Sequence, residues 1–406
     1  MQLRFVENKK IEKEIRFLTG NGEVLEALAK ANSLEPFSTD VIHFLNEVSG
    51  ELLADREAKR YPDIITYAFW IRKASVQRYK ERFCGNPKEN EVCLGRGTVF
   101  HIAPSNVPVN YAYSLAAGLL TGNKNIVRVS SKEFRQVDII NRAINKVLKN
   151  YENLKPYMIL VKYPHSREVS DYFSALSDVR VIWGGDHTIE EIRKSPLPAR
   201  SGEITFADRY SMAVIDSDYY LEEVNADRAA QSFYNDTYMT DQNACTSPRI
   251  VIWTGNSIPQ AKEIFWEHLY QIVDKKYEIQ PVQAVDKLTN MYLAAAGCAC
   301  RQIKGFDNRL VRVKIDELTP YILDYVGNSG FFYEYDCGDI LEIKGIVNDK
   351  CQTIGYIGRK EMFRPILEGG LKGIDRIVPV GKTMDFDFIW DGYNLFAEMT
   401  RVISLV

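Results

Sequence analysis

The segment that decides the fold runs from Phe100 to Ser131 and reads FHIAPSNVPVNYAYSLAAGLLTGNKNIVRVSS. It begins with an apolar run of strand length, turns through Pro-Ser-Asn into a helical pattern with Pro108 near its first turn, and ends in a second apolar run. A strand, a helix and a strand at this spacing indicate a βαβ unit. The segment therefore predicts a parallel sheet with helices on both faces.

The same alternation continues toward the C-terminus. Strand-length apolar runs occupy residues 98–103, 125–129, 158–161, 179–183 and 211–215, and helical patterns separate most of them. Parallel sheets bind ligands beyond the carboxyl ends of their strands, so we expect the chemistry in the turns that follow these strands. The usual G-x-G-x-x-G fingerprint is missing, because GRGTVF at Gly95 precedes a strand instead of following one. If a dinucleotide binds, its phosphates are contacted in another way.

A second region follows residue 215. A helical segment, 223–238, leads into a loop that contains Cys245, and an apolar strand at 249–253 comes next. Further strands are predicted at 309–315, 331–335, 340–343 and 376–380. Residues 1–90 have mostly helical patterns. Internal repeats and low-complexity linkers are missing from the sequence, so we expect the regions to pack together.

Length and composition narrow the class of protein. A chain of 406 residues exceeds a comfortable single core, so two domains are expected. A net charge of −3 and a pI near 6.1 give no basic surface for nucleic acid. The N-terminus lacks the apolar core of a signal peptide, and the most apolar stretch, 109–120, is too short to span a bilayer. A soluble cytoplasmic protein without a membrane span is the expectation.

The seven cysteines are not expected to form disulfides or a metal site. They are spread over more than half of a long chain without a secretory signal, which fits reduced thiols. Cys298 and Cys300 form a C-x-C pair, but no second ligand pair has metal-like spacing and the five histidines are isolated. We predict small buried thiols here and no metal.

Cys245 is the first candidate for catalysis. It lies in MTDQNACTSPRIVIW, residues 239–253, between small and polar residues just before a strand. A thiol in such an accessible loop can ionise and attack a carbonyl carbon. The local sequence is equally compatible with a small loop residue. The preceding Asp241 and Gln242 are expected to shape the loop.

Asn106 is the second candidate. It lies in the turn after the strand 98–103, where its amide could donate to a developing oxyanion. Capping of the following helix is the alternative role, since Ser and Asn do this routinely.

Read in order, these segments resemble the aldehyde dehydrogenase superfamily. Its Pro-x-Asn-x-Pro turn, apolar helix ending in Gly-Asn, strand with a basic residue near Ser, and later catalytic Cys correspond to PSNVP, AAGLLTGN, VRVSS and QNACTSPR. The chain more closely resembles the LuxC-type acyl-CoA reductases of bacterial luciferase systems, which share tail segments like GIDRIVPVG at 373–381 and IWDG at 389–392. The resemblance extends from about residue 92 to the C-terminus.

This resemblance implies an aldehyde-dehydrogenase-like α/β fold, with two Rossmann-like doubly wound domains and the active site between them. Residues 1–90 would form the mostly helical N-terminal part of the cofactor-binding domain and 91–215 its NAD(P)-binding part. Residues 216–380 would form the catalytic domain. Residues 381–406 would pack back or contribute to oligomerisation.

The resemblance also assigns roles to residues. Cys245 matches the nucleophile, and Asn106 matches the amide that stabilises the oxyanion together with the Cys245 backbone N–H. The residues assigned to the cofactor are Arg128 and Ser130 near the adenosine ribose, Ser131 where NAD-preferring members often have Glu, Gly184 and Gly185 before the pyrophosphate helix, Thr205, and Gln352 where a Glu holds the nicotinamide ribose. Arg128 and the missing acid at Ser131 favour NADPH, with NADH also allowed.

Thr205 also takes the position where oxidising members of the superfamily have a Glu that activates water. Glu203 lies two residues earlier and shares its face if the segment is extended, so a shifted alignment would restore that base. With Thr205 there, an acyl-enzyme would persist long enough to be reduced. The implied reaction is NAD(P)H-dependent reduction of an acyl-CoA or other acyl thioester to an aldehyde.

Two alternatives stay open at this point. An oxidising aldehyde dehydrogenase would need Glu203 or another carboxylate beside Cys245. A subunit that mainly transfers acyl groups would work with an acyl-protein synthetase. Among partners, the resemblance implies an acyl-CoA or acyl-carrier substrate, such a synthetase, and a further copy of the chain in a homo-oligomer.

Overall fold

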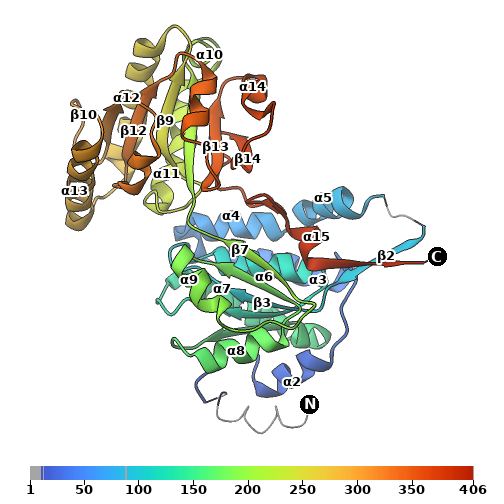
Figure 1. Ribbon diagram of the computed structural model, residues 1–406. Coiled ribbons are helices and arrows are strands. Elements are labelled where there is room, and N and C mark those ends of the chain that lie inside the picture. The colour runs from blue at the N-terminus through green and yellow to red at the C-terminus, as the bar shows by residue number, and fades with distance from the viewer. Residues whose placement is uncertain (1–10, 12, 87–88, 406) are drawn as a thin grey trace. The chain divides into compact units, whose positions relative to one another are not determined.

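The computed structural model describes residues 11, 13–86 and 89–405, and the chain divides into two compact units. Unit 1 comprises Met1–Ala207 and Phe388–Val406, and unit 2 comprises Asp208–Asp387. Each unit is built on its own, largely parallel sheet flanked by helices (Figure 1). The α/β alternation expected from the sequence is therefore present in both units.

Unit 1 contains a six-stranded sheet. In spatial order its strands are β1 (Arg16–Thr19), β5 (Met158–Lys162), β4 (Lys124–Arg128), β3 (Thr98–Ile102), β6 (Val179–Trp183) and β7 (Gly202–Phe206). β1 is antiparallel to β5, and all the other neighbours are parallel. The predicted strands at 98–103, 125–129, 158–161 and 179–183 are confirmed; β1 and β7 were not predicted.

Helices cover both faces of this sheet. They are α2 (Gly22–Lys30), α3 (Thr39–Ala54), α4 (Pro62–Ile71), α5 (Lys73–Cys84), α6 (Asn110–Leu120), α7 (Arg135–Leu148), α8 (Arg167–Leu176) and α9 (Asp186–Arg193). Phe100 and Ile102 point to the face that α2, α8 and α9 cover. His101 points to the opposite face, where its Nδ1 lies 2.7 Å from Ser114 Oγ of α6. This alternation follows from the two-residue period of a strand.

The C-terminal segment belongs to unit 1. β15 (Ile389–Trp390) and β16 (Tyr393–Asn394) form a short hairpin, α15 (Leu395–Met399) follows, and β17 (Thr400–Ser404) pairs antiparallel with β2 (Glu91–Gly95). Aromatic contacts fix this segment, since Phe396 stacks on Phe37 and Phe83. Residues 388–406 thus return to the unit in which the chain begins.

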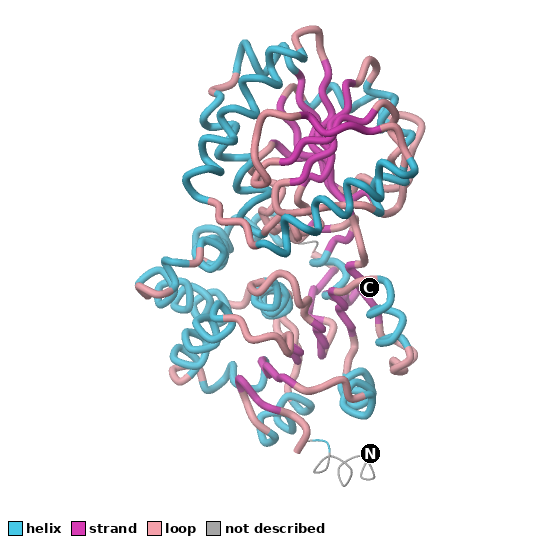
Figure 2. Tube along the Cα trace, turned by 90° about the vertical axis from the view of Figure 1, so that its left-hand side faces the viewer, coloured by secondary structure: helices cyan, strands magenta, loops and turns pink. Residues whose placement is uncertain are grey.

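Unit 2 contains a seven-stranded sheet, drawn in magenta among cyan helices in Figure 2. Its strands, in spatial order, are β10 (Cys300–Ile303), β11 (Val311–Ile315), β12 (Phe331–Asp336), β9 (Pro248–Thr254), β8 (Tyr210–Asp216), β13 (Cys351–Ile357) and β14 (Arg376–Pro379). Only the β10–β11 pair is antiparallel among the described pairings of this sheet. The predicted strands at 211–215, 249–253, 309–315, 331–335 and 376–380 correspond to β8, β9, β11, β12 and β14.

Two apolar cores sandwich this sheet. Ala213 and Ile215 pack on the side of α11 (Ala226–Thr237) and α12 (Ile258–Lys276). Met212 and Val214 pack on the other side, against residues of α13 (Pro281–Gly297) and α14 (Arg364–Leu367). The remaining helix of this unit is α10 (Ser217–Glu223). Because both faces are covered, the central strands β8 and β9 are mostly apolar, as expected for a buried parallel sheet.

Three details differ from the sequence predictions. Cys298 and Cys300 are partly exposed and not the buried thiols that were predicted. Residues 340–343 are not a strand but part of a 3-10 helix, Ile340–Gly345, because Asp339 and Glu342 form a capping box at its start. The boundary between the units lies at 207/208 and not at 215/216, because β8 is hydrogen-bonded to β9 and β13 of unit 2.

Within the described ranges, no helix is both long enough and apolar enough to cross a bilayer.

Candidate active site

Most of the residues assigned to the cofactor lie along one edge of the unit 1 sheet. β4, β3, β6 and β7 are neighbouring parallel strands, so their carboxyl ends share that edge. Arg128, Gly184 and Thr205 lie at or near the ends of β4, β6 and β7, and the exposed Asn106 lies in the turn between β3 and α6. The fold therefore brings these residues to the edge where such sheets bind ligands.

Arg128 is fixed by a buried aromatic ring. Its guanidinium carbon lies 4.6 Å from the centre of the Tyr163 ring, a cation–π contact. Burial raises the pKa of Tyr163, so this ring stays a neutral platform. Ser130 accepts a hydrogen bond from the Lys132 N–H at 3.2 Å, and the neighbouring Ser131 is exposed. No pattern in the sequence indicated that Tyr163 contacts Arg128.

Gly184 and Gly185 connect β6 to α9. A Cβ on Gly184 would lie 2.9 Å from Thr188 Cγ2, so the strand end and the first turn of α9 approach each other closely. Gly185 is the N-cap residue of α9 and its carbonyl accepts the Ile189 N–H. The two glycines leave this turn without side chains, which permits backbone contact with a phosphate at the helix start.

Glu203 is held by two arginines. Arg180 donates to its Oε2, at 2.8 Å from Nε, and Arg193 Nε lies 2.7 Å from Oε1. Glu203 pairs with Arg180 near the start of β7, whereas Thr205 lies two residues closer to the carboxyl end of that strand. A carboxylate engaged in this way is poorly suited to activate water, which weighs against the shifted alignment.

In unit 2, the loop that carries Cys245 is organised around the amide of Gln242. This side chain is fully buried; its Nε2 donates to the Pro248 and Phe331 carbonyls at 2.8 and 2.9 Å, and its Oε1 accepts from the N–H groups of Gly330 and Phe331 at 3.0 and 3.1 Å. Asp241 and Gln242 both have positive φ angles, of 50° and 58°. Gln242 shapes the loop, as its place before Cys245 led us to expect, by tying it to the start of β12.

Cys245 itself is half-buried and contacts two strands. Ser211 of β8 donates from Oγ to the Cys245 carbonyl at 2.7 Å, and its Oγ accepts the Thr353 N–H at 3.2 Å. Gln352 of β13 donates from Nε2 to the Cys245 Sγ atom at 3.3 Å. Gln352 is fully buried, so this amide has a fixed position beside the sulfur. No local signal in the sequence showed that Ser211 contacts Cys245.

A buried carboxyl group holds the chain segment next to this loop. Asp236 of α11 accepts the N–H groups of Gly381 and Thr383 at 2.6 and 3.3 Å. Burial raises the pKa of Asp236 to about 7, although these hydrogen bonds act to lower the pKa. The loop touches the same segment, since Thr246 Oγ1 lies 3.0 Å from Met384 Sδ. Sequence analysis did not identify Asp236.

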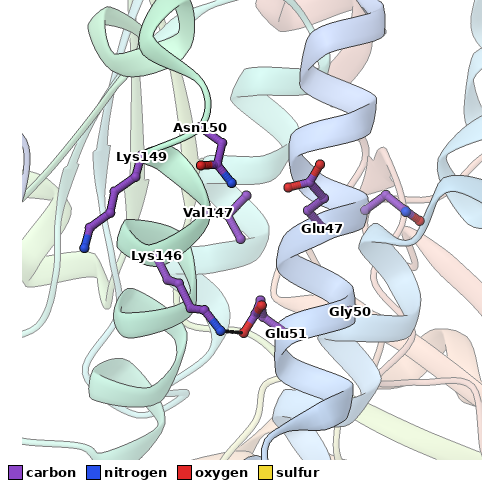
Figure 3. Close-up of a pocket in the computed structure, with 8 residues that line it drawn as sticks. Glu47, Gly50, Glu51, Lys146, Val147, Lys149 and Asn150 are labelled. Atoms are coloured by element: carbon purple, nitrogen blue, oxygen red, sulfur yellow. Dashed lines mark hydrogen bonds and ion pairs between the residues drawn. The ribbon is translucent and has the colours of Figure 1, made fainter.

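A surface hollow in unit 1 contains none of these residues. It lies between α3 and α7 and is lined by Glu47, Glu51, Lys146 and their neighbours (Figure 3). Lys146 Nζ pairs with Glu51 Oε2 across it at 2.6 Å. Its lining is mostly polar and includes no cysteine, so it offers no nucleophile for acyl transfer.

Comparison with known proteins identifies the family of the chain. A sequence model of the family described as Acyl-CoA reductase (LuxC) matches residues 75–314, more than half of the chain. The chain belongs to the LuxC family. It is 29% identical over 343 residues to a long-chain acyl-protein thioester reductase of Vibrio harveyi. The aligned region covers 76% of this chain and 69% of that protein. A relative of the same description from Aliivibrio fischeri is 24% identical, and the aligned region covers 70% of this chain and 58% of that protein.

The fold is that of the aldehyde dehydrogenases. Aldehyde dehydrogenase 21 from Physcomitrella patens superimposes with a TM-score of 0.65 at 13% identity, over 94% of this chain and 88% of that one. As a LuxC family member with this fold, the chain is an oxidoreductase. The family match includes Asn106, Arg128, Thr205 and Cys245, whereas Gln352 lies beyond it. The roles of these residues stay predictions, and Asn106 and Cys245 belong to different units.

Proposed function

We propose that this LuxC family member reduces an acyl thioester to an aldehyde with NAD(P)H, and that Cys245 carries the acyl group. The observation that carries the proposal is the setting of Cys245. This half-buried residue lies in a loop fixed by Gln242. Ser211 donates a hydrogen bond to its carbonyl, and Gln352 donates one to its sulfur. A small loop residue without a chemical role would not require this support.

The acylation step needs a nucleophile and a place for the oxyanion. The Cys245 sulfur attacks the carbonyl carbon, the bond from that carbon to the donor thiol breaks, and the released thiol takes up a proton. The resemblance to aldehyde dehydrogenases assigns the oxyanion to the Asn106 amide and the Cys245 backbone N–H. Asn106 is exposed in the β3–α6 turn and therefore accessible to a ligand.

The residues at the edge of the unit 1 sheet fit a dinucleotide. The bare turn at Gly184 and Gly185 suits a pyrophosphate before α9, and Arg128 supplies a fixed positive charge at the end of β4. Because Ser131 replaces the carboxylate found in NAD-preferring members, we propose NADPH as the preferred cofactor and NADH as an alternative. The hydride that reduces the S-acyl group is the chemistry that the bound cofactor supplies.

Thr205 and Cys245 direct the intermediate toward reduction. Thr205 has no carboxylate to activate water, and Glu203 is engaged by Arg180 and Arg193, so the S-acyl group is protected from hydrolysis. After reduction, Cys245 leaves as a thiolate when the thiohemiacetal collapses, and the aldehyde is released. The proposed donor is an acyl-CoA, as in the description of the family, or an acylated protein, as in the names of the relatives. An acyl-protein synthetase and a further copy of the chain are the proposed partners.

The proposal is tested by turnover of NADPH with acyl-CoAs of graded length. Wild type should consume NADPH and release aldehyde, trapped as a hydrazone. Cys245→Ala should abolish this, whereas Cys298→Ala, a matched loss of a half-exposed thiol in the same unit, should not. Equal activity in Cys245→Ala and wild type would refute the proposal.

A further inference from the structure

Two β-bulges lie on either side of Ser211. On β13, Cys351 pairs with Tyr210 and Thr353 pairs with Ser211, so Gln352 is an extra residue without a partner in the ladder. On β9, Pro248 pairs with Ser211 and Ile250 pairs with Met212, so Arg249 is extra in the same way. β9 and β13 are the two neighbours of β8 in the sheet (Figure 1). Bulges redirect side chains and are enriched beside active sites.

The bulge in β13 aims a donor at the sulfur of Cys245. Gln352 Nε2 lies 3.3 Å from Sγ, and the amide is fully buried. An N–H that donates to a thiolate is a charge-assisted hydrogen bond, stronger than one to a neutral thiol. A carboxylate at this position has no hydrogen to donate and would repel the thiolate. An amide at 352 therefore favours the ionised sulfur.

The bulge in β9 carries Arg249, whose positive charge interacts with the charge of Cys245. Arg249 is four residues from Cys245, and its Nε is buried without a hydrogen-bond partner among the described residues. Burial lowers the pKa of the guanidinium, and the charges of Cys245 and Asp208 act in the opposite direction. Close by, Arg209 is paired with Asp375 and so contributes little net charge. Arg249, on which Asp208 also acts, is thus the charge to consider at the thiolate.

We infer that the paired bulges hold Cys245 as a thiolate, with Gln352 as a catalytic residue that donates to the sulfur and Arg249 as a positioning residue that supplies positive charge. The inference rests on the proposed function, in which Cys245 is the nucleophile. The same two groups act again when the thiohemiacetal collapses, because Cys245 then departs as the thiolate they stabilise.

The test is the pH dependence of Cys245 alkylation in the full-length protein. Iodoacetamide reacts with the thiolate, and peptide mass spectrometry separates Cys245 from the other six cysteines. Wild type should give a Cys245 pKa below the ordinary value of about 8.5. Gln352→Met, which keeps the length and loses the donor, should raise it by about one unit. Gln352→Glu should raise it by about two units.

Arg249 is tested with two variants. Arg249→Met should raise the Cys245 pKa by about one unit, and Arg249→Lys, which keeps the charge, should restore most of the shift. Gln302→Glu and Arg301→Met make the same changes at exposed positions of β10, which three other strands separate from β8, and should leave the Cys245 pKa unchanged. Thermal unfolding identifies the variants that fold. If the carboxylate in Gln352→Glu prevents folding, the result for Gln352→Met decides the test.

An unchanged Cys245 pKa in folded Gln352 and Arg249 variants would overturn the inference. Acylation of the wild type by acyl-CoA is a separate measurement that tests the proposed function. If Cys245 becomes acylated while its pKa does not respond to the variants, the inference fails alone. If the pKa responds but no acyl group attaches to Cys245, the proposed function fails alone.

Discussion

Replacement of Gln242 by Ala tests whether one buried amide fixes the loop that carries Cys245. The change removes two donors and two acceptor contacts, to the backbone groups of Pro248, Gly330 and Phe331. These backbone groups are buried with the side chain and cannot all reach water in the folded state. In the wild type all four of these backbone groups are hydrogen-bonded to Gln242, whereas the variant leaves them without that partner.

The expected loss follows from the four hydrogen bonds. At a net value of about 1 kcal/mol each, Gln242→Ala should lower the free energy of unfolding by about 4 kcal/mol. That is a large part of the roughly 5–15 kcal/mol that stabilises a typical domain. The released loop should also expose Cys245, so its alkylation under native conditions should become faster.

Urea unfolding, followed by circular dichroism, measures the first effect, and mass spectrometry of alkylated peptides measures the second. Gln271→Ala, on the exposed surface of α12 in the same unit, is the matched control and should change stability by less than about 0.5 kcal/mol. A loss below about 1 kcal/mol in Gln242→Ala, with unchanged Cys245 alkylation, would refute the reasoning.

Three further predictions concern both units. Thr205→Glu should increase the ratio of free acid to aldehyde, measured by chromatography of the products, because it adds a carboxylate where oxidising members of the superfamily have one; an unchanged ratio would contradict this. Arg128→Ala should raise the KM for NADPH about tenfold more than for NADH, because only the 2′-phosphate loses a charged hydrogen bond; equal effects would show that Arg128 does not contact that phosphate. Burial raises the pKa of Asp236 from 3.8 to about 7, so its contribution to stability is full below pH 3.8 and is lost as pH rises through about 7. The wild type should therefore lose stability relative to Asp236→Asn between about pH 4 and 7 in urea unfolding, and a constant difference would exclude this role.

Much of the fold could be predicted because both sheets are largely parallel and buried on both faces. Strands such as β5 and β9 then contain continuous apolar runs that stand out from the helical patterns between them. β13 was missed because Gln352, Thr353 and Gly355 interrupt its apolar pattern, and only its place beside β8 makes it a strand. Residues 340–343 looked like a strand, but the local capping box of Asp339 and Glu342 turns them into a helix.

The site was less predictable than the fold. Cys245 and Asn106 stand in recognisable segments, so the resemblance to aldehyde dehydrogenases assigned them directly. The contact between Gln352 and Cys245 joins residues 107 positions apart and depends on a bulge, for which the sequence has no local signal. Sequence reasoning assigned Gln352 to the nicotinamide ribose, a role that stays a prediction; its amide oxygen and nitrogen can serve two different groups.

The central claim, that Cys245 carries the acyl group, is tested most directly by intact-mass spectrometry after incubation with acyl-CoA and no cofactor. The wild type should gain the mass of one acyl group, with loss of CoA, and the adduct should map to the peptide that contains Cys245. Cys298→Ala should retain the adduct and Cys245→Ala should lose it. An acyl adduct that persists in Cys245→Ala, or a wild type that gains no acyl group from any chain length, would contradict the account.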